Sequence, residues 1–422
     1  MSKRIVYLRT DIGAHQLNAG GSVAHTLGVI EGFRAQGYQV SVGSSAMIAL
    51  LQKQELPLLT ILCMPRVVTW LGYKISCLLS NIVFTFQART LLRSAAPQAL
   101  YQRYSMLNMT GLVLSWWYRV PLILEYNGSE AWIDAQWSPR KLVKLSWLVY
   151  WVERTNLTYA DTIIVVSEVL KEQLCSAGID SRKIAVIPNG VNTAQYDPSR
   201  YAHERLSLRT SLQVEQAFVV GFIGTFSYWH GIELLAHVIP LAVRRNRAIK
   251  FLLIGSGPLQ GWLQQQLDNA RVHDAVRFTG TIAQDQAPAY LAACDAYVCP
   301  TQTNADGTRF FGSPTKLFEY MSMGKPILAS RLEQLEYLLQ PCLYAHELEQ
   351  RYPQALAITA HPHSVIEWVN ALCWLAQADP ELRIMLGANA RARALQAHSW
   401  TEHVNHIIQA YTHVRRAAHV LK

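Results

Sequence analysis

The chain has 422 residues, of which 50% are hydrophobic, and a formal net charge of +9 at pH 7. This length exceeds that of one ordinary hydrophobic core, so we expect two domains of about 200 residues each. Seven cysteines without a C-x-x-C pair exclude a disulfide framework and a zinc site. The first residues lead directly into a strand pattern, and there is no window of eighteen uncharged apolar residues. We therefore expect a cytoplasmic chain without a signal peptide or a transmembrane segment.

Positive charge is concentrated in residues 66–154, which hold ten basic residues against four acidic ones and seven of the twelve tryptophans. Basic residues interleaved with aromatic rings favour contact with an anionic membrane surface. Here Ser138 and Pro139 are predicted to open a helix that places Trp147 and Trp151 on one face. The alternative is a core helix whose lysines extend to solvent. No recognition motif accompanies the charge, so we expect no nucleic acid partner.

Short apolar strands alternate with helical patterns along the chain, which predicts an α/β protein with parallel sheets covered by helices. In the first half we predict strands at residues 5–8, 40–42, 100–102, 122–125 and 162–166. In the second half we predict strands at residues 219–223, 251–254, 276–279, 296–299 and 327–329. The polar segment 192–204 is the predicted linker, so we expect doubly wound domains at 1–195 and 196–400. Apolar residues at helical spacing predict a final helix within 401–422.

Two polar segments of the first half follow predicted strands. Gly20 and Gly21 precede a predicted helix, where backbone amides can approach a phosphate; a tight turn without a ligand is the alternative. The segment LILEYNGSEAW places Glu125, Asn127 and Glu130 at and beyond a strand end, where open α/β sheets bind ligands. We expect one of these groups to contact a sugar or to assist an acceptor hydroxyl. A turn at Asn127 and a first-turn helix carboxylate at Glu130 are the alternatives.

The segment 297–330 contains a helix with a misplaced charge. Ser313 is the predicted cap, Pro314 fits the first helical position and Gly324 ends the helix. Lys316 then falls in the first turn, where the helix dipole disfavours a cation by roughly 0.3–1 kcal/mol. A bound phosphate removes this conflict, and Glu319 on the same side suits the hydroxyls of a ribose. The pair therefore indicates a nucleoside diphosphate, with a solvent-exposed i,i+3 ion pair as the alternative.

The sequence FGSPTKLFEYMSMGKPILAS resembles the donor-binding segment of family 4 glycosyltransferases, which are retaining enzymes of the GT-B fold. Four further segments are similar to family segments in the same order: VIPNGVN, VGFIGTFSYWHGIELL, FLLIGSGP and VRFTGTI. The resemblance implies two Rossmann-like domains that face a central cleft. It further implies that the first domain binds the acceptor, that the second binds a nucleotide sugar, and that the helix at 401–422 crosses back to the first domain.

The resemblance also implies how the donor is held. Gly20 and Gly21 face the diphosphate, while Lys316, with help from Arg309 or His230, stabilises it as it departs. Glu319 holds the ribose, and the loop 312–315 positions the sugar. No metal and no other cofactor is then required. The remaining donor-binding positions are Gly224, Thr225, Ile282, Gly312, Ser313, Pro314 and Thr315.

The chain departs from the commoner family pattern at three positions. Thr225 and His230 stand where many relatives carry an arginine and a lysine, and Phe311 stands where many carry a glutamate. Asp306 is a candidate replacement for that glutamate. His230 lies in a loop after the carboxyl end of a strand, which favours a role in the cleft over a purely structural one. The departures put the identity of the donor sugar most in doubt.

We therefore predict a retaining hexosyltransferase of class EC 2.4, with Lys316, Glu319, Asn127 and Glu130 as its catalytic candidates. It would transfer a sugar from a UDP-sugar, or next a GDP-sugar, to a lipid-linked or membrane-associated saccharide in surface polysaccharide biosynthesis. We expect it on the inner face of the cell membrane as a peripheral protein. The alternatives are a non-catalytic membrane-docking subunit and a sugar-nucleotide 2-epimerase. A nicotinamide oxidoreductase is disfavoured because GSGP at 255–258 lacks the third glycine of the dinucleotide motif.

Overall fold

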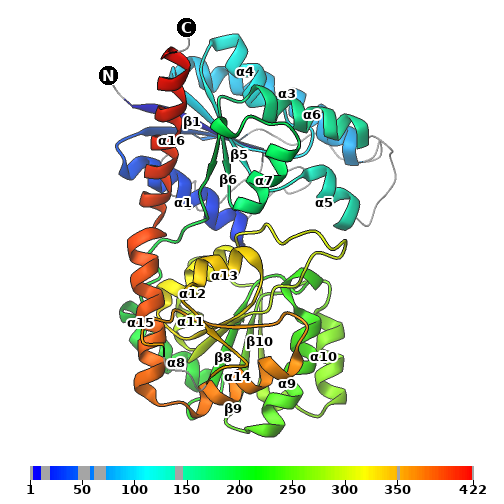
Figure 1. Ribbon diagram of the computed structural model, residues 1–422, viewed down its shortest axis with the longest axis vertical. Helices are drawn as coiled ribbons and strands as arrows, with labels where there is room; N and C mark the ends of the chain where they lie inside the picture. Colours follow the sequence, from blue (N-terminus) through cyan, green and yellow to red (C-terminus); the bar gives the residue numbers. More distant parts are fainter. Residues whose placement is uncertain are drawn as a thin grey trace. The chain divides into compact units, whose positions relative to one another are not determined.

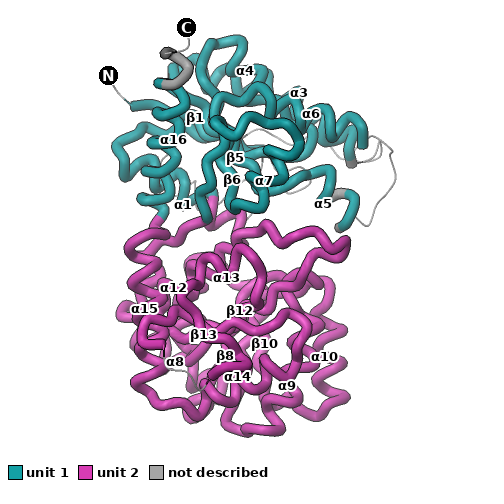
Figure 2. The backbone as a smooth tube through the Cα atoms, in the orientation of Figure 1, with its two compact units in different colours: residues 1–18, 26–188, 400–422 teal, residues 19–25, 189–399 magenta. Residues whose placement is uncertain are grey.

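The computed structural model describes residues 3–10, 20–45, 58–60, 73–137, 146–348 and 352–420. The chain forms two compact units (Figure 2). Unit 1 comprises Met1–Asn18, Thr26–Pro188 and Trp400–Lys422, and unit 2 comprises Ala19–His25 and Asn189–Ser399. Each unit is built on a seven-stranded parallel sheet with helices packed against it (Figure 1). The prediction of two doubly wound, Rossmann-like domains is confirmed.

The sheet of unit 1 has the strand order β3-β2-β1-β4-β5-β6-β7. Its strands are β1 (Arg4–Arg9), β2 (Gln39–Ser44), β3 (Leu58–Thr60), β4 (Ala99–Arg103), β5 (Leu122–Tyr126), β6 (Thr162–Val165) and β7 (Ile184–Val186). The central strands are apolar and buried on both faces, as expected where helices cover a parallel sheet. All five predicted strands are present, whereas the three-residue strands β3 and β7 were not predicted.

The helices of unit 1 are α1 (Gly21–Ala35), α3 (Tyr73–Ala95), α4 (Thr110–Tyr118), α5 (Glu130–Trp137), α6 (Ser146–Tyr159), α7 (Glu168–Ser176) and α16 (Trp400–Val420). The first residues of α1 are grouped with unit 2. The final helix, α16, packs closely against α1: a Cβ atom added at Gly32 would lie 2.5 Å from the carbonyl oxygen of Trp400. The absence of a side chain at Gly32 therefore allows the two helices to approach.

One helix among the described residues, α3, is long and apolar enough to cross a membrane by length and composition alone. Core helices of folded domains meet the same criteria. In unit 1, α3 packs against β1, β2 and α4, and it buries Phe84, Ala88, Leu91 and Leu92. This packing accounts for part of its apolar surface, while Ile82 and Phe86 of the same helix are exposed. The expectation that the chain does not span a membrane stays a prediction.

The sheet of unit 2 has the strand order β10-β9-β8-β11-β12-β14-β13. Its strands are β8 (Phe218–Ile223), β9 (Ile249–Ile254), β10 (Val276–Gly280), β11 (Ala296–Cys299), β12 (Ile327–Ser330), β13 (Leu343–Tyr344) and β14 (Ile358–Ala360). The five predicted strands are present, and the short strands β13 and β14 were not predicted. The order changes direction between β8 and β11, which is where open α/β sheets bind ligands at the carboxyl ends of their strands.

The helices of unit 2 are α8 (Ala202–Ser211), α9 (Ile232–Arg245), α10 (Gln260–Asn269), α11 (Ala287–Ala292), α12 (Thr315–Met323), α13 (Glu333–Leu339), α14 (Val365–Gln377) and α15 (Pro380–Ala397). Two apolar clusters form the core. One includes residues of α9 and α14, and the other includes residues of α11 and α12. The second cluster fixes α12, the helix that carries Lys316 and Glu319.

Candidate functional site

Helix α12 begins close to the predicted residue, but its cap differs from the prediction. Pro314 is the N-cap and makes no side-chain capping bond, while Gly324 ends the helix in the left-handed conformation at φ 64°. Ser313 is therefore not the cap. Its Oγ accepts a hydrogen bond from Asn189 N at 3.2 Å, and its carbonyl oxygen accepts one from Asn189 Nδ2 at 2.5 Å. These bonds join the start of α12 to the segment VIPNGVN, and the first amides of the helix receive no bond from the capping side chain.

Lys316 lies in the first turn of α12, and its side chain is buried. Only 7% of the residue is exposed, and its Nζ lies 4.3 Å from the centroid of the Phe222 ring. Within the described residues its ammonium group makes no hydrogen bond or ion pair. Burial lowers the pKa of Lys316 from 10.5 to about 8. A cation with a buried stem, an aromatic neighbour and no carboxylate partner favours an anionic ligand.

Gly224 makes the position of Lys316 possible. It follows β8 with a φ of +147°, and a Cβ atom added there would lie 2.7 Å from Lys316 Nζ. Gly255, after β9, in turn approaches the carbonyl oxygen of Gly224 too closely for any side chain. The first glycine of GSGP therefore serves the packing of two loops.

Glu319 lies one turn after Lys316 and is also buried. Its Oε1 accepts hydrogen bonds from Tyr196 Oη at 3.0 Å and from Gln284 Nε2 at 3.4 Å. Its Oε2 accepts no hydrogen bond from the described residues. Burial raises the pKa of Glu319 to about 7. Because both side chains are buried and no ion pair joins them, the interpretation as a solvent-exposed salt bridge is wrong.

The start of α1 belongs to the same unit and lies beside the start of α12. Gly20 N donates a hydrogen bond to Gln284 Oε1 at 3.2 Å. A Cβ atom added at Gly21 would lie 2.6 Å from Thr315 Oγ1. Ile282, two residues before Gln284, is half-buried against the second core cluster. The structure therefore brings two helix amino termini together next to Lys316, an arrangement suited to a phosphate.

His230 lies near Lys316 but does not act as a second cation. Its Nδ1 is 2.7 Å from the carbonyl oxygen of Thr225, so Nδ1 carries the proton and donates this bond. Burial and the charge of Lys316 lower the pKa of His230 below its ordinary value, and the imidazole is neutral at pH 7. The remaining nitrogen, Nε2, is then an acceptor, and the role of His230 at the diphosphate stays a prediction.

Two other candidates are engaged elsewhere. Arg309 is exposed, and its Nε lies 3.9 Å from Glu333 on α13. The Oδ1 of Asp306 accepts bonds from the backbone nitrogen of Thr308 at 3.0 Å and from its hydroxyl at 2.7 Å, which closes a local turn. Neither side chain is brought into contact with Lys316, so Lys316 is the cation that the described part of this site provides. Gly312 packs under Phe310, since an added Cβ atom would lie 2.9 Å from that ring.

A second cluster lies at the carboxyl end of β5 in unit 1. Glu125 is buried and accepts hydrogen bonds from Tyr101 Oη at 2.8 Å and Arg103 Nη1 at 3.0 Å. Asn127 donates a further bond to the same carboxylate through Nδ2. Glu130 begins α5, and its backbone nitrogen donates to Glu153 Oε2 at 2.9 Å. Of the two predicted catalytic residues of this domain, Asn127 thus binds the Glu125 carboxylate, and the backbone of Glu130 binds Glu153.

Two family models match the chain one after the other. The model described as Glycosyltransferase Family 4 matches residues 19–195, and the model described as Glycosyl transferases group 1 matches residues 217–383. Together they cover most of both units, in the order that the resemblance predicted. The chain belongs to the family 4 glycosyltransferases.

Known family members resemble this chain over different extents. An uncharacterized glycosyltransferase of Methanocaldococcus jannaschii is 25% identical over 59% of this chain and 59% of its own length. The alpha-monoglucosyldiacylglycerol synthase of Streptococcus pneumoniae is 23% identical over 60% of this chain and 57% of its own length. The chain thus matches less than two thirds of these relatives. The HepE protein of Anabaena, solved in complex with UDP and glucose, shares the fold with a TM-score of 0.68, 19% identity and coverage of 97% and 99% of the two chains.

The structure of this family 4 chain adds residues that the sequence did not indicate. Tyr196 and Gln284 contact Glu319, and Phe222 supports Lys316. Tyr196 lies in the segment expected to be a linker, and its role depends on contacts far apart in sequence. Glu153, which binds the start of α5, lies inside α6 and shows no local signal. Of these residues, only Phe222 could have been proposed from the sequence, because it lies in the predicted strand just before Gly224.

Proposed function

We propose that this chain transfers a sugar from a nucleoside diphosphate donor, with UDP first and GDP next, to a lipid-linked or membrane-associated saccharide. One observation carries the proposal: Lys316 is buried in the first turn of α12, and its ammonium group forms no hydrogen bond or ion pair with the described residues. The complex of Anabaena HepE with UDP supports the choice of UDP. The lipid product named for the pneumococcal relative supports a lipid-linked acceptor.

A diphosphate satisfies several groups of this site at once. It accepts hydrogen bonds from the uncapped amides of α12 and pairs with Lys316, whose burial otherwise disfavours its charge. In the reaction, negative charge grows on the departing diphosphate. A fixed cation and fixed helix dipoles therefore stabilise the transition state more than the bound donor. The proposed step needs no metal ion.

The ribose fits the other side of α12. Tyr196 and Gln284 occupy Oε1 of Glu319, which leaves Oε2 to accept a hydrogen bond from a ribose hydroxyl. We expect the configuration at the sugar to be retained, with the leaving phosphate accepting the proton of the acceptor hydroxyl. The loop 312–315 offers backbone groups next to this position, and the neutral His230 offers an acceptor nitrogen.

A thermal-unfolding panel of UDP-, GDP-, ADP- and TDP-sugars tests the donor assignment. A ligand at 100 times its dissociation constant raises the free energy of unfolding by about 2.7 kcal/mol. We expect UDP-sugars to give the largest effect and Glu319→Ala to lose most of it. Glu204→Ala, which removes an exposed carboxylate of the same unit, is the matched control. Release of an epimerised sugar from the donor alone would contradict transfer to an acceptor.

The membrane contact is proposed on the exposed aromatic face of unit 1. Helix α6 buries Val149, Val152 and Leu157, while Trp147 and Trp151 are 68% and 54% exposed. The tryptophans are therefore not in the core, whereas the core-helix alternative requires them to be buried there. The segment 138–145 in front of α6 lies outside the described residues. Amphipathic aromatic rings on such a face bind at the level of lipid headgroups.

The aromatic face continues from α6 onto α4 and α3. The rings of Trp116 and Tyr159 are 5.7 Å apart, and those of Phe86 and Trp117 are 6.2 Å apart. The guanidinium of Arg89 lies 5.3 Å from the Trp117 ring and adds positive charge. A peripheral position on the inner face of the cell membrane follows as part of the proposal.

Flotation with liposomes tests this contact. We expect binding that increases with anionic lipid, decreases with salt and falls in the double variant Trp147→Ala and Trp151→Ala. Tyr337→Ala removes an exposed aromatic side chain from unit 2 and serves as the control. Binding that ignores both lipid charge and salt, or that survives the double variant unchanged, would contradict the proposed surface.

A further inference from the structure

The sheet of unit 2 carries a second polar site, at the opposite ends of its strands. Gly224 and Gly255 follow the carboxyl ends of β8 and β9, whereas Asp295 and Lys325 precede the amino ends of β11 and β12. A pocket of about 670 Å³ lies around Asp295 and Lys325 and is lined also by Phe218. This volume is that of a typical small-molecule site.

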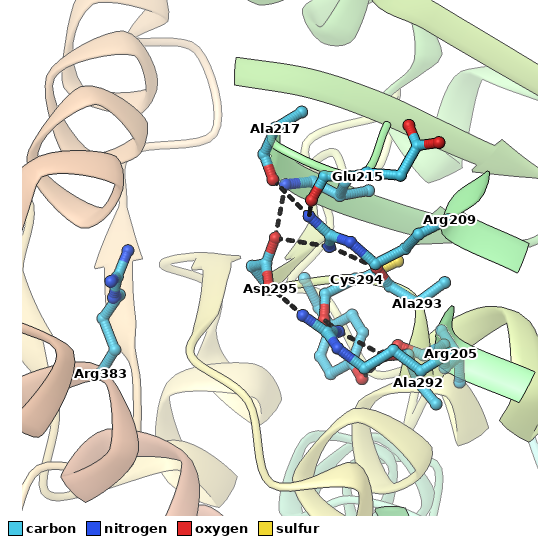
Figure 3. Close-up of polar contacts among 12 residues, drawn as sticks. Arg205, Arg209, Glu215, Ala217, Ala292, Ala293, Cys294, Asp295 and Arg383 are labelled. Atoms are coloured by element: carbon cyan, nitrogen blue, oxygen red, sulfur yellow. Dashed lines mark hydrogen bonds and ion pairs between the residues drawn. The ribbon is translucent and has the colours of Figure 1, made fainter. Parts of the chain in front are cut away.

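The carboxylate of Asp295 in this pocket is already satisfied. Its two oxygens accept hydrogen bonds from Arg205 Nη2 at 2.6 Å and Arg209 Nη1 at 2.9 Å, and the backbone nitrogen of Val219 donates another. Figure 3 shows these bonds converging on Asp295. Arg391, on the wall formed by α15, pairs with Asp197 at 3.1 Å. These groups build a rigid polar wall, and they leave no charge without a partner.

Two other cations of the pocket form no ion pair with a carboxylate of the described residues. Lys325 is half-buried, and its ammonium group makes no hydrogen bond or ion pair with the described residues. Arg383 lies 5.4 Å from the centroid of the Phe218 ring and reaches one carbonyl oxygen, that of Leu375, at 3.5 Å. In Figure 3, Arg383 lies apart from the Asp295 cluster, and the carboxylate of Glu215 points away from Asp295.

Structural roles explain part of this arrangement. Lys325 follows the carboxyl end of α12, where the helix dipole favours a cation. Burial and then the neighbouring Arg205 lower the pKa of Lys325, and the carboxylate of Asp295 opposes this shift. The dipole of α12 does not explain the position of Arg383, which lies on α15. Two cations from different elements thus line one pocket, and neither forms an ion pair with a carboxylate of the described residues.

We propose that this pocket binds a small organic phosphate. A phosphomonoester carries nearly two negative charges at pH 7 and three acceptor oxygens, which match one ammonium and one planar guanidinium. The apolar side chains of Phe218 and Ile384 in the lining suit the body of such a molecule. The site is separate from the proposed donor site, and it does not depend on the glycosyltransferase activity.

Calorimetric titration with glucose 6-phosphate, glucuronate and glucose tests the site, because the three probes share a ring and differ in charge. We expect binding of glucose 6-phosphate, weaker binding of glucuronate and none of glucose, both with and without UDP. Lys325→Gln and Arg383→Gln should each raise the dissociation constant for glucose 6-phosphate roughly tenfold. Arg393→Gln removes an equal charge from α15 outside the pocket and should leave it unchanged.

The variants lie on different elements, so misfolding of one leaves the other as a test. Lys316→Gln distinguishes this pocket from the donor site. Retained binding in Lys316→Gln supports the proposal, whereas loss there places the phosphate at α12 and overturns it. Equal binding of glucuronate, or binding insensitive to both pocket variants, overturns it as well.

Discussion

Two buried carboxylates, Glu125 in unit 1 and Glu319 in unit 2, differ in how completely they are paired. Glu125 accepts hydrogen bonds from Tyr101, Arg103 and Asn127, so both of its oxygens have donors. Glu319 receives two bonds on one oxygen, and Lys316 beside it has no anionic partner among the described residues. A complete network of this kind stabilises the folded chain, whereas an incomplete one costs stability until a ligand completes it. Glu125 therefore contributes to the stability of unit 1, whereas Glu319 retains an oxygen for the proposed ligand.

The largest expected effect comes from removing the cation of the incomplete site. Lys316→Met keeps the apolar stem and removes the charge, so we expect UDP to bind at least 100-fold more weakly. The free protein should become more stable by about 1–3 kcal/mol, because a buried ammonium without a partner is lost. Isothermal titration and chemical unfolding measure the two effects.

Arg271→Met, which removes a charge from the surface of the same unit, is the control for this variant and should change neither quantity. A Lys316→Met protein that binds UDP normally would show that the diphosphate lies elsewhere. A variant that is less stable than the parent would show that the ammonium group already has a compensating environment.

The complete cluster should respond in the opposite way. Glu125→Ala leaves the buried hydroxyl of Tyr101 and the guanidinium of Arg103 without an acceptor, so we expect a loss of about 2–4 kcal/mol in the free energy of unfolding. UDP affinity, which depends on unit 2, should stay unchanged. Glu168→Ala removes an exposed carboxylate of unit 1 as the control. Loss of UDP binding at unchanged stability would instead give Glu125 a direct role at the ligand.

Sequence reasoning reached the central elements of the fold and the two charges of the site. The ten predicted strands correspond to strands of four to six residues, whereas the four missed strands, β3, β7, β13 and β14, have only two or three residues each. Lys316 and Glu319 were found because a cation in a first helical turn breaks a local rule. Tyr196 and Gln284 were missed because their roles arise from contacts across 123 and 35 residues of sequence. The capping role of Ser313 was wrong because a tertiary bond to Asn189 replaced the local one.

The pH dependence of UDP binding should follow the two shifted groups. Burial lowers the pKa of Lys316 from 10.5 to about 8, so the folded chain binds this proton less tightly than the unfolded chain. The free energy of unfolding therefore decreases as the pH falls from 10.5 to about 8. Burial raises the pKa of Glu319 from 4.5 to about 7, so the folded chain binds this proton more tightly than the unfolded chain. The free energy of unfolding therefore decreases as the pH rises from 4.5 to about 7. Between pH 7 and 8 both groups are charged, and their combined contribution to the free energy of unfolding is at its minimum.

The proposed UDP site uses both charged forms, so the affinity for UDP should be highest between pH 7 and 8 and fall by about tenfold for each pH unit beyond either limit. Titrations at pH 6, 7.5 and 9 measure this profile. Lys316→Met should remove the alkaline decrease while Glu319→Gln removes the acidic one. A flat profile for the parent protein would contradict the assignment of these groups to the ligand.

The smallest predicted effect tests how Glu319 is positioned. Tyr196 Oη donates to Glu319 Oε1 at 3.0 Å and accepts from Gln284 Nε2 at 3.0 Å, so Tyr196→Phe frees the carboxylate to move. We expect UDP to bind roughly threefold to tenfold more weakly, since one hydrogen bond contributes about 1 kcal/mol. Pyrophosphate, which lacks the ribose, should bind equally to both proteins. Tyr201→Phe, whose hydroxyl bonds only to Gln195 among the described residues, is the control. An equal loss for UDP and pyrophosphate would mean that Tyr196 supports the start of α12 as a whole and not the ribose contact of Glu319.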